Sequence, residues 1–315
     1  MMKTTPLLLP LLLSCATLAQ PLAATPAQAP LDCAGLAHSA EAEPPGWAAQ
    51  CAPRTNAPVP GPWRASALAP DDLAFAYNLT AANGGPDRGL HAFLLDDFPG
   101  VSLIGDAGMH IYALDFDPTG TILHAIDNDL RALGTLDIGT GQFTSTAPVS
   151  GVPNNANFTG LTIHPVTGAA YVSDSVTGGN STLYSIDLDT GVADVIGDMG
   201  VPLMIDIAMN CAGELYGHSI TTDSFYRIDP DTGAADLVGP YQFSTNFAQG
   251  MDFDNASGKL YASLYIGSGR NVFGTFDLDT GAFNPLSVDD PLGEWELAIP
   301  TSCENIFANG FESPW

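Results

Sequence analysis

Basic side chains are scarce in this sequence. Its 315 residues contain 8 Lys and Arg against 35 Asp and Glu, a formal net charge of −27 at pH 7. Binding to nucleic acid and docking on anionic lipid both depend on Lys and Arg that neutralise phosphates. The composition therefore argues against both functions, and we expect no nucleic acid among the partners.

Catalytic motifs and long apolar runs are also missing. The sequence holds no His-Glu-x-x-His, no phosphate-binding Gly-x-x-x-x-Gly-Lys and no Gly-x-Ser-x-Gly; the segment 217–221 fails the last pattern at its fifth position. No run approaches the roughly 18 apolar residues of a membrane-spanning helix. No Cys-x-x-Cys occurs, which disfavours zinc ribbons and redox dithiols.

The N-terminus has the pattern of an export signal. Lys3 precedes a mostly apolar run from Leu7 to Leu18, and Ala19 closes it with a small residue. This pattern predicts a signal peptide over residues 1–19 and a secreted, periplasmic or cell-surface protein. The alternative is a lipoprotein signal, Leu12-Leu13-Ser14-Cys15, with a lipid anchor on Cys15.

Four further cysteines predict two disulfides, since an even count is typical of exported chains. They are Cys33, Cys51, Cys211 and Cys303. Three pairings are open; the local choice joins Cys33 to Cys51 and leaves Cys211 with Cys303. Ala and Pro fill about half of residues 20–71, which favours a linker or loose cap for this segment.

A repeat begins near residue 72. Five apolar anchors, each in a segment that alternates apolar with small or polar residues, follow at spacings of 47, 46, 44 and 46: Leu114, Leu161, Ile207, Met251 and Leu297. Such alternation indicates a strand. Each full repeat adds a turn, a second strand, a variable loop, a third strand, a turn ending in Thr-Gly and a fourth strand. Four strands in about 45 residues are typical of a β-propeller blade.

The first repeat starts at its second strand, residues 74–77, so its innermost strand must come from elsewhere. Residues 294–301 can supply it and close the ring. We therefore predict an all-β protein, a β-propeller of five four-stranded blades over residues 72–301, followed by a tail at 302–315. Six blades are the fallback if residues 64–69 form an extra strand.

The repeats resemble those of bacterial extracytoplasmic propellers with YVTN- or NHL-like repeats. The resemblance rests on Leu-Tyr second strands, as at 215–216 and 260–261, and on the Asp-x-Asp-Thr-Gly turns at 187–191, 229–233 and 277–281. It implies the propeller fold. Because such propellers include binding modules, lactonases and quinoprotein relatives, it implies no single activity. We interpret the turns as Asp-capped rather than as calcium loops, because they lack a closing Glu.

Four acidic side chains fall on the innermost strands opposite the apolar anchors: Asp115, Asp206, Asp252 and Glu296. Alternation along a strand places them toward the axis. Like charges this close raise each other's pKa unless a cation separates them, and calcium accepts several oxygen ligands. We expect these residues as candidate ligands of an axial Ca²⁺; the alternative is a water-filled acidic channel.

The loops at one end of a propeller are the usual place for a ligand. Here they bring together four candidate ligand-binding residues, with Asn154 and Asn155 nearby: Gln249, Trp295, His218 and Asn246. Trp295, between two Glu residues, could stack on a sugar or hold a cation. The alternatives are a Trp packed between blades and an interior His.

The main hypothesis is a non-catalytic exported propeller that binds a small ligand, a glycan or a protein. One alternative is a metal-assisted hydrolase or lactonase in which Asp206, Glu296 and an axial cation activate water. The other is a purely structural surface protein. Binding to glycans would distinguish the binding propeller from the structural protein. Turnover of lactones or esters would distinguish the enzyme from both of these.

Overall fold

A computed structural model describes residues 72–80, 86–98, 100–176, 178–247, 249–267, 270–290, 293–300 and 303. Every regular element in these ranges is a β-strand, and none of the described residues forms a helix that could span a membrane. The predicted signal peptide, Cys15, the Cys33–Cys51 pair, the segment 64–69 and most of the tail lie outside the described residues.

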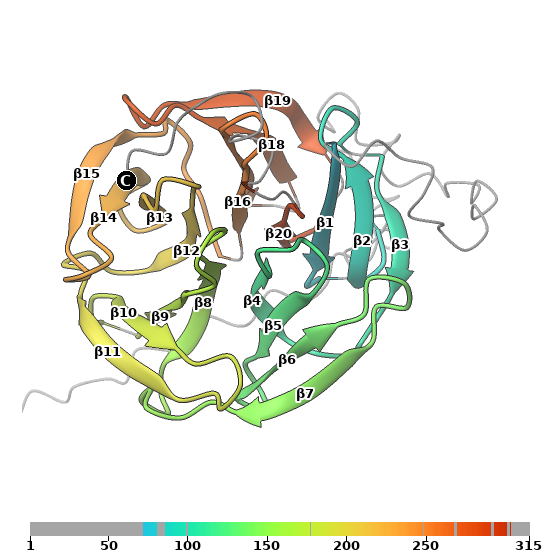
Figure 1. Ribbon diagram of the computed structural model, residues 1–315. Coiled ribbons are helices and arrows are strands. Elements are labelled where there is room, and N and C mark those ends of the chain that lie inside the picture. The colour runs from blue at the N-terminus through green and yellow to red at the C-terminus, as the bar shows by residue number, and fades with distance from the viewer. Residues whose placement is uncertain are drawn as a thin grey trace, which may run out of the picture. The chain divides into compact units, whose positions relative to one another are not determined.

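The strands form five four-stranded antiparallel sheets arranged around a central axis (Figure 1). From the inside outwards, blade 1 consists of β20 (Trp295–Ala298), β1 (Leu73–Asn78), β2 (Gly89–Leu94) and β3 (Ser102–Gly105). Blade 2 consists of β4 (Ile111–Phe116), β5 (Leu123–Asp127), β6 (Ala132–Leu136) and β7 (Phe143–Pro148). Blade 3 consists of β8 (Asn157–Ile163), β9 (Ala170–Ser175), β10 (Thr182–Ile186) and β11 (Ala193–Asp198).

The last two blades follow the same order. Blade 4 consists of β12 (Met204–Met209), β13 (Leu215–Ser219), β14 (Ser224–Ile228) and β15 (Ala235–Pro240). Blade 5 consists of β16 (Gly250–Asp254), β17 (Lys259–Gly267), β18 (Arg270–Phe276) and β19 (Phe283–Asp290). The prediction of five blades rather than six is confirmed.

The two ends of the repeat region close the ring within blade 1. β20 pairs with β1 in antiparallel register, Leu297 opposite Ala76, so the innermost strand of the first blade does come from the far end of the chain. β20 is shorter than the predicted segment 294–301. It also packs against β4 and β16, the innermost strands on either side.

The apolar anchors of the repeat form the interior between the blades. All five are buried on the innermost strands and pack against aromatic and aliphatic side chains of neighbouring sheets: Leu114, Leu161, Ile207, Met251 and Leu297. The alternation seen in the sequence therefore corresponds to one packed face of each innermost strand.

The Asp-x-Asp-Thr-Gly turns connect the two outer strands of a blade and dock on the preceding blade. In the turn at 187–191, the Asp187 carboxylate accepts the N–H groups of Asp189 (3.0 Å) and Thr190 (2.8 Å), and Gly191 has a φ of 69°, as the Asp-capped interpretation predicts. In the next blade, the Thr232 carbonyl lies where a Cβ at Gly197 of β11 would be. The glycine thus permits this close approach between blades.

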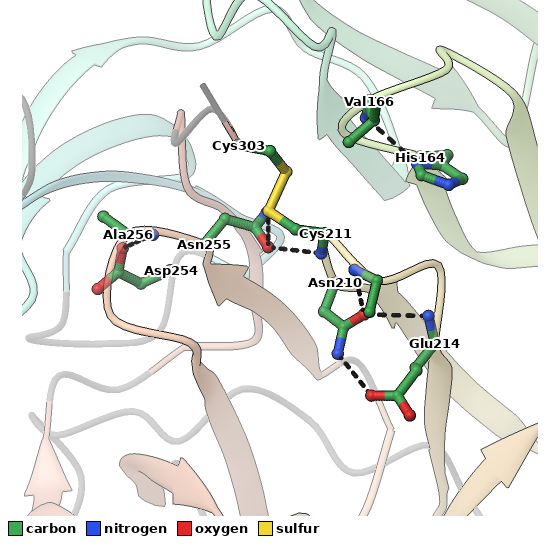
Figure 2. The surroundings of a disulfide bond; sticks show 10 residues. His164, Val166, Asn210, Cys211, Glu214, Asp254, Asn255, Ala256 and Cys303 are labelled. Atoms are coloured by element: carbon green, nitrogen blue, oxygen red, sulfur yellow. Dashed lines mark hydrogen bonds between the residues drawn. A yellow bond between two sulfur atoms is a disulfide. The ribbon is translucent and has the colours of Figure 1, made fainter. Parts of the chain in front are cut away.

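A disulfide joins Cys211, in the turn between β12 and β13, to Cys303 after β20 (Figure 2). This confirms the predicted pairing of these two cysteines. Asn255, in the neighbouring turn of blade 5, accepts the Cys211 N–H at 3.1 Å. The link spans 92 residues and ties the chain that follows the closing strand to blade 4. The closing strand β20 is therefore connected to blade 4 by a covalent bond as well as by packing.

Removing this lock tests its contribution. We expect the double substitution Cys211→Ser and Cys303→Ser to lower the free energy of unfolding by about 2–4 kcal/mol, because the unfolded chain regains the entropy of a long loop. Urea denaturation monitored by tryptophan fluorescence measures the change. Dithiothreitol should destabilise the wild type and leave the double variant nearly unaffected; equal stability of the two proteins would contradict the role assigned to the disulfide.

Candidate functional site

Three of the four predicted axial acids connect adjacent innermost strands. One Asp115 oxygen accepts the N–H of Phe116 (2.6 Å), and the other accepts the N–H of Ile163 on β8 (2.6 Å). Asp206 bonds in the same way to Ile207 on its own strand (2.8 Å) and to Met251 on β16 (2.6 Å). Each carboxylate thus satisfies one donor on its own strand and one on the next blade.

Asp252 repeats this arrangement, and a threonine replaces it at one junction. Asp252 accepts the N–H of Phe253 (2.7 Å) and of Ile299 beyond β20 (2.6 Å). Between blades 3 and 4 the Thr162 hydroxyl accepts the N–H of Met209 at 3.1 Å. We call these four links the inner-strand staples. They occupy four of the five blade junctions.

The staples provide acceptors for backbone N–H groups at the axial edges of the innermost strands. The innermost strand of a blade has no neighbour on its axial side, so its backbone N–H groups there lack a sheet partner. A buried N–H without an acceptor costs free energy, and an oxygen of a carboxyl group on the innermost strand can accept a hydrogen bond from such a donor. An acid on one innermost strand therefore satisfies its own edge and joins it to the next.

Burial of these acids shifts their titration. Loss of hydration raises the pKa of Asp115 to about 7, although the N–H groups of Ile163 and Phe116 oppose the shift. Burial also raises the pKa values of Asp206 and Asp252 well above the usual range, with repulsion from neighbouring acids adding to it. Burial is also the main cause that raises the pKa of Glu296 well above its usual range, and the charges of Asp206 and Glu294 raise it further.

The axial acids do not gather into a metal-ligand cluster within the described residues, where no group of three or more His, Cys, Asp or Glu is placed to hold a metal ion. The physical reason is the staple itself: both oxygens of Asp206 are directed at backbone N–H groups. The same use of Asp206 leaves the hydrolase alternative without a free carboxylate at this position. Axial calcium stays a prediction.

Three of the four predicted loop-face residues lie in the interior instead. His218 and Gln249 have no exposed surface and bond to each other at 2.8 Å, and burial lowers the pKa of His218 to about 4. The Gln249 amide also donates to the Asn246 carbonyl at 2.5 Å. Only Asn246 is exposed. The placement of His218 agrees with the alternative of an interior His. Its Nε2 bonds to the Gln249 side chain across blades 4 and 5, so neither residue reaches the loop face.

Trp295 is also fully buried. Its ring makes edge contacts with His91 (4.9 Å between centroids) and Phe98 (6.0 Å), inside an aromatic cluster that joins blades 1 and 5. This placement agrees with the alternative of a Trp packed between blades and leaves the ring no surface on which to stack a sugar. Trp295 lies two residues before the anchor Leu297 on β20, so both side chains point to the same, packed face of the strand. We call residues that share a face in this way residues of the same parity.

The structure also reveals a loop clamp that sequence analysis missed. Arg131, in the turn just before β6, donates to the carbonyls of Ala156 (2.9 Å) and Val152 (3.2 Å), and its guanidinium lies 4.7 Å from the centre of the Phe158 ring. The Asn128 side chain exchanges two hydrogen bonds with the backbone of Phe158 (3.0 and 2.8 Å). The chain has only 8 Lys and Arg, so a single Arg in a loop was the feature of the sequence that could have indicated this clamp.

The comparisons with known proteins concern the fold. A family model described as "Repeat of unknown function (DUF6923)" matches residues 102–292, and no curated protein matches the chain. Among solved structures, a nidogen/laminin complex has 13% identity and a TM-score of 0.46, over 73% of this chain and 98% of that one.

Two further propellers are similarly distant. TolB from Acinetobacter baumannii has 15% identity and a TM-score of 0.45, over 70% of this chain and 56% of that one. A calcium-binding protein, regucalcin, from Agrobacterium tumefaciens has 17% identity and a TM-score of 0.42, over 65% and 68%. At this distance the likenesses carry no argument about ligands. The YVTN- or NHL-like assignment stays a prediction.

Removing one staple should destabilise the ring. We expect Asp252→Ala to lower the free energy of unfolding by about 2–4 kcal/mol, because two buried N–H groups lose their acceptor. Asp252→Asn keeps one acceptor and should cost less. Urea denaturation at pH 6 measures both, with Asp189→Ala in an exposed turn as a control expected within about 0.5 kcal/mol of wild type. If Asp252→Ala unfolded at the same urea concentration as the wild type, the stabilising role of this staple would be refuted.

The raised pKa values predict that stability falls as the pH rises from about 4 to about 7, the folded pKa of Asp115 and of Glu294. In the unfolded chain these acids titrate near 4, so the folded state holds protons that the unfolded state has lost. Each retained proton lowers the free energy of unfolding by about 1.4 kcal/mol per pH unit. His91 and His218, with folded pKa values lowered to about 4, contribute an opposite slope only below about 6.5.

Urea midpoints in buffers that contain EDTA and no added amine test this slope. Glu296→Gln removes one of the titrating groups and should flatten the curve. Stability that stays level or rises over the same interval would mean that the acids are ionised in the folded protein.

Proposed function

The chain belongs to the family of repeats of unknown function DUF6923, whose description assigns no activity. We therefore propose a function from its geometry. The protein is an exported, non-catalytic propeller that binds a glycan or similar polar ligand through its loop face. The support for export is the predicted signal peptide at residues 1–19. The support for binding is the loop clamp.

The clamp holds the β7–β8 loop, residues 149–156, in one conformation. Arg131 binds the carbonyls at both ends of its tip, Val152 and Ala156. Ser150 at the start of the loop bonds to the next turn through its N–H to Gly191 (3.0 Å) and its carbonyl to Ala193 (2.9 Å). A loop fixed by its neighbours loses little entropy when it binds a ligand.

The fixed tip presents polar side chains. Asn154 and Asn155 are exposed between the two carbonyls that Arg131 holds, and Asn157 is exposed just beyond them. An amide side chain offers both a donor and an acceptor, as do the hydroxyl groups of a sugar. Leu130 in the adjacent β5–β6 turn is 60% exposed and supplies an apolar surface. The arrangement suits a hydroxyl-rich ligand with an apolar face.

A glycan array with the purified protein tests this function. We expect binding to a subset of glycans and at least a tenfold loss of affinity in the double variant Asn154→Ala and Asn155→Ala, because the amide contacts disappear. Asn284→Ala on the outer strand β19 is the matched control, since Asn284 is an equally exposed amide away from the loop. Arg131→Ala should weaken binding through the loop conformation.

The array also separates the alternatives. Binding that survives the Asn154→Ala and Asn155→Ala substitutions would place the ligand elsewhere on the molecule. No binding to any glycan, together with turnover of a lactone or ester, would favour an enzyme and overturn the proposal.

A further inference from the structure

The fifth blade junction breaks the pattern of the inner-strand staples. Between blade 1 and blade 2 the corresponding position on β20 is occupied by Glu296, one methylene longer than the aspartates. By analogy with the staples, its carboxylate would accept the N–H groups of Leu297 and Leu114, and neither bond forms. β4 shifts its register to β5 between Ile111 and Leu114, so the edge that faces Glu296 is irregular.

Glu296 is left buried without a partner. Its exposed fraction is 2%, and among the described residues its side chain has no hydrogen bond or ion pair. Its direction follows from its neighbours: Ala298, with the same parity on β20, packs with Leu114 and Phe116 of β4, whereas Leu297 packs on the opposite side toward blade 5. The free carboxylate therefore points into the junction of blades 1 and 2, beside the axis.

A second carboxylate lies above it toward the loop face. Glu294 is two residues earlier on the same extended segment, held by a bond from the Leu79 N–H to its carbonyl (2.9 Å), so it shares the parity of Glu296. It is partly exposed, and its side chain has no hydrogen-bond partner in the described part of the chain. Burial raises its pKa to about 7.

Tyr112 on β4 faces these two acids across the junction. The charges of Glu294 and Glu296 both raise the pKa of its hydroxyl, after burial. The ring is partly exposed and stacks on His110 at 6.5 Å between centroids. Two carboxylates and an aromatic ring thus line one junction, open to solvent at Glu294 and Tyr112 and closed below by Glu296.

The geometry points to a cation subsite in this junction, in which Glu294, Glu296 and Tyr112 hold the primary ammonium group of a ligand. An ammonium group has three N–H donors, which two carboxylates and a tyrosine hydroxyl can accept, and the ring adds a cation–π attraction. This subsite does not depend on the proposed glycan binding at Asn154 and Asn155.

An ammonium group suits the junction better than a metal ion. Calcium takes six to eight oxygen ligands, and Asp206, another axial acid whose charge acts on Glu296, already directs both oxygens at backbone N–H groups. The described residues offer no group of three acids placed for a metal. A single ammonium needs only the two free carboxylates and compensates their charge.

Isothermal titration calorimetry at pH 8 and constant ionic strength tests the subsite, with n-propylammonium chloride and calcium chloride as separate probes. We expect saturable binding of propylammonium, weakened at least tenfold in Glu296→Gln and unchanged in Glu214→Gln, a control just before β13 in blade 4. Because binding of the ammonium favours the ionised form of Glu296, protons are released. The measured heat should therefore differ between phosphate and HEPES buffers, neither of which contains a primary amine, in the wild type only.

Three results would overturn the inference: no saturable heat with propylammonium, equal binding by Glu296→Gln, or binding of calcium alone. Glu296→Gln conserves the side-chain volume and removes a buried charge, so it should fold, and a thermal melt checks this. Should it fail to fold, Glu294→Gln at the more exposed position supplies the same comparison. Because the probe is a simple amine, a negative result leaves the glycan array unaffected, and the two proposals fail separately.

Discussion

The ring depends on one interaction: two backbone N–H groups on adjacent innermost strands donate hydrogen bonds to the same buried aspartate side chain. A propeller blade ends at the axis in an unpaired strand edge, and five such edges meet in a small space. Asp115, Asp206 and Asp252 each satisfy donors on two strands, and Thr162 satisfies one donor on the next strand. The blades are thereby joined where no sheet hydrogen bond can form between them.

This solution concentrates acids in the interior of a protein that has few cations to balance them. Burial raises the pKa of each stapling aspartate, while the backbone donors oppose that shift. The two effects have a common origin, because the low-polarity surroundings that penalise a charge also strengthen its hydrogen bonds. The interior of the ring is therefore coupled to pH through the same groups that hold it together.

Departures from the repeat carry the functional information. Where the repeat is kept, the capping and stapling aspartates accept backbone N–H groups, as Asp187 and Asp206 do. Where it is broken, at Glu296 and in the loop fixed by Arg131, polar groups are left free or are presented to solvent. A polar side chain that the scaffold does not use is available to a ligand.

The sequence by itself determined the strand pattern, the five blades and the closing strand, because period-two alternation and a repeat of about 46 residues are local properties. It left three cysteine pairings open, and the tertiary structure shows Cys211 joined to Cys303. The sequence also placed four acids on the innermost strands. Only the tertiary structure decided what those acids do and which loop residues reach solvent. Strand parity assigns a side chain to one of two faces, but the partners on that face come from a neighbouring blade some 45 residues away. Trp295 and Gln249 were buried, and Asp206 was bonded to Met251, by contacts of that kind.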